Sequence, residues 1–146
     1  MDLRAAQLGC AAKKSEIVAA GRGPDDVDVL VDIEVMIATD APTARRRLAE
    51  LDSVADGTWR PQTLHYVGTP IGLARLIADI HVVGIADGVT LLPLSLPDVL
   101  GHITFETIPW LESLGARICP RGIRMLRERS VNPLAATSLP TRWARS

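Results

Sequence analysis

The stretch that decides the fold is VDVLVDIEVMI, residues 27–37. Every odd position in it carries Val or Ile, whereas the even positions mix Asp, Leu, Glu and Met. β-Branched side chains at period two are typical of a strand that buries one face, and a helical period fits the stretch poorly. A breaker at residues 21–24 precedes it and ends an Ala-rich segment over residues 3–20, for which we predict a helix.

Downstream of this strand the sequence alternates helix and strand signals. Asp40 followed by Pro42 starts a helix over residues 42–52, and a loop is expected over 52–62. A second strand over 63–67 runs into Thr69 and Pro70, the cap and first position of a helix over 70–82.

The last strand and helix follow a turn near residue 87. The near-continuous apolar run at 89–94 predicts a third strand buried on both faces. A helix over 97–114 closes the series; Pro109 should kink it and Gly115 should end it.

This order is a helix followed by three strand–helix pairs, which indicates an α/β fold with a parallel sheet and right-handed crossovers. We predict a partial (β/α)₈ TIM barrel of about three C-terminal units plus the preceding helix, because a complete barrel takes about 250 residues. The three strands should then be parallel and adjacent in chain order. A small open sheet is the alternative, although its two unpaired edges are usually avoided.

Composition sets limits on function. The chain has 146 residues, 47% of them hydrophobic, and a net charge of -1, which gives no electrostatic reason to expect a nucleic acid or an anionic membrane as partner. No signal peptide and no run of roughly 20 apolar residues is present. Cys10 and Cys119 form neither a metal-ligand spacing nor a disulfide framework, so free thiols in the cytoplasm are expected.

Several segments resemble, in order, the C-terminal part of the luciferase-like flavin-dependent monooxygenases, in the nitrilotriacetate and dibenzothiophene-sulfone monooxygenase branch. The segment at residues 19–27 is similar to the family's "aGR-x-P-D-D-V". Residues 66–70 are similar to "V-G-T/S-P", residues 84–93 to "G-x-A-D-G-F-x-L-x-P", and residues 108–111 to "V-P-x-L". Residues 122–129 are similar to the terminal "G-x-T-L-R-E-R-L-G", but Ser130 breaks the pattern where the family has Leu.

The resemblance implies oxygenation of a small organic substrate by O₂ and reduced flavin, FMN or in some members a deazaflavin. The cofactor supplies the oxygen chemistry, and the protein positions it. In relatives most flavin contacts come from earlier strands that this sequence lacks, so the resemblance assigns no catalytic residue, leaves the cofactor-binding residues unknown, and predicts no tight flavin binding. The implied partners are an N-terminal barrel portion or a full-length homologue, and a flavin reductase. A non-catalytic remnant or association module is the alternative.

Barrel chemistry occurs where strands end. That rule singles out Thr39 and Asp40, Gly68 and Thr69, and Pro93 to Ser95. For Asp40 and Thr69, helix capping is the favoured interpretation. Gly68 could allow close approach of a ligand or simply form a tight turn.

Other charged residues give weaker signals. Asp28, Asp32 and Glu34 share one strand face, which is expected to be solvated or ion-paired. His65, His81 and His102 fall in separate predicted elements, so no metal site is predicted.

Two domains are expected, residues 1–116 and an Arg-rich, partly ordered tail over 117–146. The tail has seven arginines and one glutamate, and it is expected to pack on a neighbouring acidic surface; a basic-tailed nucleic-acid binder remains a remote alternative. The chain alone is expected to be aggregation-prone or oligomeric, because open sheet edges attract partners.

Overall fold

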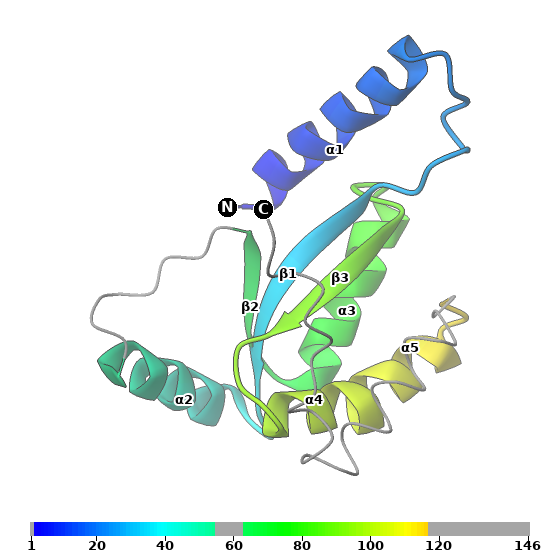
Figure 1. Ribbon diagram of the computed structural model, residues 1–146. Helices are drawn as coiled ribbons and strands as arrows, with labels where there is room; N and C mark the ends of the chain where they lie inside the picture. Colours follow the sequence, from blue (N-terminus) through cyan, green and yellow to red (C-terminus); the bar gives the residue numbers. More distant parts are fainter. Residues whose placement is uncertain (1, 55–62, 117–146) are drawn as a thin grey trace, which may run out of the picture.

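The computed structural model describes residues 2–54 and 63–116. Within these residues the strands form a single parallel sheet, and a helix follows each of them (Figure 1). The α/β class and the parallel sheet predicted from the sequence are therefore confirmed. In chain order the elements are α1 (Leu3–Ala19), β1 (Leu30–Ile37), α2 (Ala41–Val54), β2 (Leu64–Gly68), α3 (Pro70–Val82), β3 (Gly88–Pro93), α4 (Asp98–His102), the π-helical η1 (Ile103–Thr107) and α5 (Ile108–Ser113).

The order of the strands differs from the one predicted. β1 lies in the middle, giving β2-β1-β3, and Ile33 of β1 is opposite both Leu64 and Leu91. The prediction that the strands are adjacent in chain order is wrong, because β3 pairs with β1 and not with β2. β1 is the longest strand and carries the most deeply buried residues, so the core gains most when it has a neighbour on each side. This order is that of a small open sheet.

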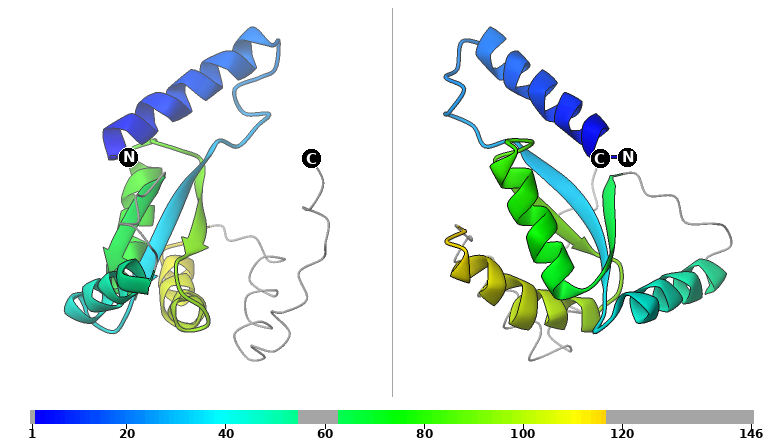
Figure 2. Two further views of the ribbon diagram at one scale, coloured as in Figure 1. Left: turned by 60° about the vertical axis from the view of Figure 1, so that its left-hand side comes forward. Right: turned by 180° about the vertical axis from the view of Figure 1, so that it is seen from behind.

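One face of the sheet holds the core. Val31, Ile33, Val35 and Ile37 are buried, as expected for the β-branched positions of this strand. Figure 2 shows α3 lying across this face when the molecule is seen from behind. The core cluster also includes Leu73, Ile80, Val99, Ile103 and Ile108 from α3 and the last helices, and Ala6 and Cys10 from α1.

The opposite face is mostly uncovered in the described residues. Side chains on it include Leu30, Asp32 and Glu34 of β1, and the register adds His65 of β2 and Thr90 and Leu92 of β3; we call these six residues the open face. Met36, on the same side, is buried where α2 approaches the carboxyl end of β1. The prediction that β3 is buried on both faces is therefore wrong: Leu92 is 38% exposed and Thr90 is exposed.

α1 lies beyond the amino ends of the strands (Figure 1), where its Ala6 and Cys10 are buried in the core cluster and the Asp87 carboxylate adds polar contacts. Asp87 Oδ1 accepts from Lys14 Nζ at 2.7 Å, and Asp87 Oδ2 accepts from the backbone N–H of Val29 at 2.9 Å. These hydrogen bonds, with the Lys14 bond the larger cause, lower the pKa of Asp87. Since the Val29 N–H is bound by this side chain, the strand predicted from residue 27 begins only at Leu30.

The final helix of the prediction is interrupted. Instead of one helix over 97–114, α4 passes into the π-helical turn η1 immediately before α5, in which Pro109 is the second residue. Pro109 has no N–H to donate and its ring needs room, and a π turn relieves both constraints. Thr107 of η1 is buried and donates to the Pro70 carbonyl at 3.2 Å. Gly115 ends the helix with φ 78°, as predicted.

The other helices agree closely with their predicted ranges. α1 and α3 match within a residue, and the α3 bounds are those predicted. α2 runs to Val54, two residues beyond the predicted end, and the remainder of the loop predicted over 52–62 lies outside the described residues. The tail predicted over 117–146 also lies outside them.

Candidate functional site

The carboxyl ends of the three strands meet at one edge of the sheet, which we call the rim. The Ala38 N–H, after β1, donates to the Gly68 carbonyl at 3.1 Å, and the Leu94 N–H, after β3, donates to the Val35 carbonyl at 3.0 Å. The predicted gathering of Thr39/Asp40, Gly68/Thr69 and Pro93/Leu94 along one rim is therefore confirmed.

Two polar residues of the rim cap helices. Asp40 accepts from the Thr43 N–H at 2.7 Å and from the Thr43 hydroxyl at 3.0 Å, and these bonds lower the pKa of Asp40. Thr69 Oγ1 accepts from the Gly72 N–H at 3.2 Å, ahead of Pro70 at the first helical positions. Capping, the interpretation favoured from the sequence, is confirmed for both residues.

Gly68 has a different role from the two considered for it. Its φ is not positive, so its backbone conformation does not require glycine. A Cβ at this position, however, would lie 2.6 Å from Tyr66 Oη. At Gly72, in the first turn of α3, an added Cβ would be closer still, 2.0 Å from the same oxygen. Tyr66 Oη also donates to the Thr69 carbonyl at 3.3 Å. The two glycines therefore make room for the Tyr66 ring at the β2–α3 junction.

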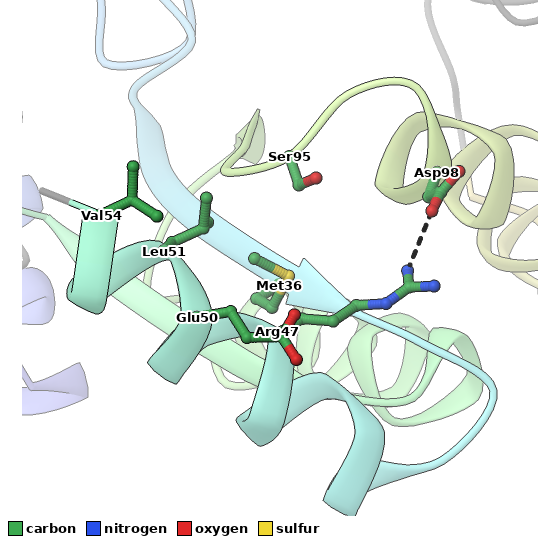
Figure 3. Close-up of a pocket in the computed structure, with 7 residues that line it drawn as sticks. All are labelled: Met36, Arg47, Glu50, Leu51, Val54, Ser95 and Asp98. Atoms are coloured by element: carbon green, nitrogen blue, oxygen red, sulfur yellow. Dashed lines mark ion pairs between the residues drawn. The ribbon is translucent and has the colours of Figure 1, made fainter.

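Beside the rim is a groove with a volume of about 270 Å³ (Figure 3). It lies between α2 and the segment after β3, at the carboxyl end of β1. In open α/β sheets, ligands bind outside the carboxyl ends of the strands where the connections diverge. Here β1 leads into α2 and β3 leads into α4, so the groove occupies that position. Its lining residues are Met36, Arg47, Glu50, Leu51, Val54, Ser95 and Asp98.

An ion pair crosses the groove. Arg47 Nη1 of α2 lies 3.3 Å from Asp98 Oδ2 of α4 (Figure 3). The contact is an ion pair without a hydrogen bond, because Nη1 has no hydrogen-bond partner among the described residues. The side chains are 36% and 59% exposed, so the pair adds little to stability. Glu50 supplies a second carboxylate and Ser95 a hydroxyl. This set can hold a small polar molecule, and its candidate acid and base groups are the carboxylates of Glu50 and Asp98.

Sequence reasoning found part of this groove. Ser95 belongs to the predicted rim and lines the groove, whereas Pro93 pairs with Val35 inside the sheet. Arg47, Glu50 and Asp98 were not singled out from the sequence. The available signal was the helical spacing of Arg47, Glu50, Leu51 and Val54, which places all four on one side of α2.

The remaining charged candidates do not gather with the groove. Asp32 and Glu34 lie on the open face, and Asp28 precedes β1. His65, His81 and His102 lie in three different elements, as predicted. Within residues 2–54 and 63–116, no group of three or more His, Cys, Asp or Glu side chains could hold a metal ion.

Two further findings bear on identity. Among the described residues no helix has the length and apolar character needed to cross a membrane. Comparison with family models and with curated proteins gave no match for this chain.

Proposed function

We propose that this chain is the C-terminal part of a luciferase-like flavin-dependent monooxygenase. In this proposal it oxygenates a small organic substrate, with O₂ and reduced FMN or a deazaflavin, only in company with an N-terminal barrel portion. The proposed partners are an N-terminal barrel portion or a full-length homologue, and a flavin reductase that supplies the reduced cofactor.

One observation carries the proposal: the family-like segments mark the junctions of a parallel α/β sheet in the right order. The segment 19–27 runs from the end of α1 towards β1, and residues 66–70 end β2 and begin α3. Residues 84–93 run from the turn after α3 through all of β3. Each strand therefore ends on the rim, where barrel enzymes carry out their chemistry.

The order β2-β1-β3 limits how a barrel could be completed. In the proposed barrel, β1 and β3 are neighbours in the wall, because their pairing extends from Leu30 opposite Gly88 to Val35 opposite Pro93. β2 then occupies the other edge of β1, where an earlier strand would have to attach. Completing the barrel therefore requires β2 to be displaced or to act as a wall strand itself.

The described residues of this chain form no site for a whole flavin nucleotide. The groove of about 270 Å³ is smaller than the roughly 300–1,000 Å³ of typical ligand pockets. Asp40 is a carboxylate, which repels a phosphate, and Thr69 Oγ1 accepts from the Gly72 N–H as a helix cap. We therefore assign no flavin contact to the described residues, and the proposal places those contacts on an N-terminal barrel portion.

The second candidate is a non-catalytic association module, and the strand order favours it. β1 already has a neighbour on each side, so the described sheet does not need further strands to surround its central strand. The uncovered face and the outer edges of β2 and β3 would then serve binding rather than catalysis.

Titration with oxidised FMN, followed by quenching of flavin fluorescence, separates the two candidates. The chain alone should bind with a dissociation constant weaker than about 10 μM. Mixed with the N-terminal barrel portion of a luciferase-like monooxygenase, it should form a complex that binds FMN more tightly than either part. A complex without gain in FMN affinity would support the association module. Absence of any complex, or tight FMN binding by the chain alone, would contradict the proposal.

A further inference from the structure

The open face combines exposed apolar and acidic side chains at the centre of the sheet. Leu30 is 53% exposed and Leu92 is 38% exposed, which is unusual for leucines on a parallel sheet. Asp32 follows Leu30 on the same face of β1 and is also exposed. Figure 1 views the sheet from this side, with α3 behind it.

The two acids of the open face lack cationic partners in the described part of the chain. No hydrogen bond or ion pair between described residues involves the Asp32 carboxylate. Glu34 Oε2 is buried and has no hydrogen-bond partner. A buried carboxylate oxygen without a donor is costly, so a cation brought to this face would be stabilising.

We infer that the Arg-rich segment of residues 117–146 binds the open face of the sheet. The segment carries seven arginines against one glutamate, so it complements the charge of Asp32 and Glu34. It also intersperses apolar side chains among the arginines, as in Ile123-Arg124-Met125-Leu126-Arg127, which matches the leucines beside the two acids. An extended chain of this length spans roughly 100 Å, enough to reach any part of the sheet from Ala116.

Charge disfavours the other occupants. A second copy of the sheet would place the same acids against each other, which is repulsive. Nucleic acids and anionic membranes are repelled by Asp32 and Glu34 for the same reason. The inference does not depend on the proposed function, because it concerns only this chain.

Amide hydrogen exchange of the full chain, measured by mass spectrometry, tests this binding. Amides within residues 117–146 should exchange about tenfold or more slowly than in an unstructured peptide of the same sequence. The double variant Asp32→Asn/Glu34→Gln should remove that protection. The control Asp79→Asn/Glu112→Gln removes the same charges from α3 and α5 and should leave it unchanged.

Substitutions in the tail test the same contact without altering the sheet. Arg124→Gln/Arg127→Gln should also lose protection, and combining it with Asp32→Asn/Glu34→Gln should add little, as for partners in one interaction. Protection of β1 amides shows in the same data that the sheet stays folded. Any of three results would overturn the inference. The amides of the tail could exchange fully in the unaltered protein, or the control variant could lose as much protection as Asp32→Asn/Glu34→Gln. The third is protection that grows with protein concentration.

Discussion

Replacing Gly72 by Ala tests the packing at the β2–α3 junction. In an ordinary helix this change is stabilising by up to about 1 kcal/mol, because alanine has the higher helix propensity. At Gly72 the new Cβ would lie 2.0 Å from Tyr66 Oη and 3.2 Å from Thr69 Oγ1. The Tyr66 ring must move, and overpacking of this kind typically costs about 1–3 kcal/mol. We expect a net loss of about 1 kcal/mol, or a fall of about 4 °C in Tm.

The same geometry predicts a rescue. Tyr66→Phe removes the oxygen that collides and leaves Cζ, at 3.2 Å, as the nearest ring atom to the new Cβ. The loss of the hydrogen bond to the Thr69 carbonyl should cost about 0.5–1 kcal/mol by itself. In that background Gly72→Ala should be neutral or stabilising, so the two substitutions should couple by about 1–2 kcal/mol.

Urea unfolding followed by circular dichroism measures these free energies, with Gly9→Ala as the control. Gly9 lies in α1, and a Cβ added there would have no neighbouring atom within 4 Å, so alanine at this position should stabilise the chain. If Gly72→Ala stabilises the protein as much as Gly9→Ala, the described packing of Tyr66 is wrong.

Three other predictions concern stability. Asp87→Asn should break the ion pair with Lys14, and faster amide exchange throughout α1 would show that the helix has loosened. Thr107→Val should cost about 1 kcal/mol in urea unfolding, because the hydrogen bond from the buried Thr107 hydroxyl to the Pro70 carbonyl is lost. The pKa values of the Asp40 and Asp87 carboxyls are lowered in the folded state. Their contribution to stability is therefore fully present above about pH 4 and is lost as the pH falls through the folded pKa values. Tm measured as a function of pH should show this decline, and a Tm that stays level below about pH 4 would contradict it.

Local signals in the sequence predicted the elements well. The stripe of β-branched residues identified β1, and Thr69 followed by Pro70 located the start of α3 to the residue. These signals act through neighbouring residues of the chain, as capping and side-chain alternation do. Position 109 similarly indicated an irregular helix, although the π-helical form depends on how Thr107 packs against α3.

Long-range features could not be predicted in the same way. The choice of β1 rather than β2 as the neighbour of β3 depends on the total burial of the sheet, to which no single segment points. Arg47 and Asp98 meet only because α2 and α4 flank the same strand ends. Gly72 resembles any helical glycine in sequence, and only the position of the Tyr66 ring explains it.

The position of β1 between β2 and β3 is the claim that weighs most between the two candidate functions, because it favours the association module and limits how a barrel could be completed. Nuclear Overhauser effects between backbone amide and α protons, measured on the full chain, test it directly. We expect contacts of the residues around Glu34 with those around His65, contacts of the residues around Asp32 with those around Thr90, and none between β2 and β3. Contacts between β2 and β3, with none between β1 and β3, would contradict the described sheet and restore the chain-order arrangement of a barrel.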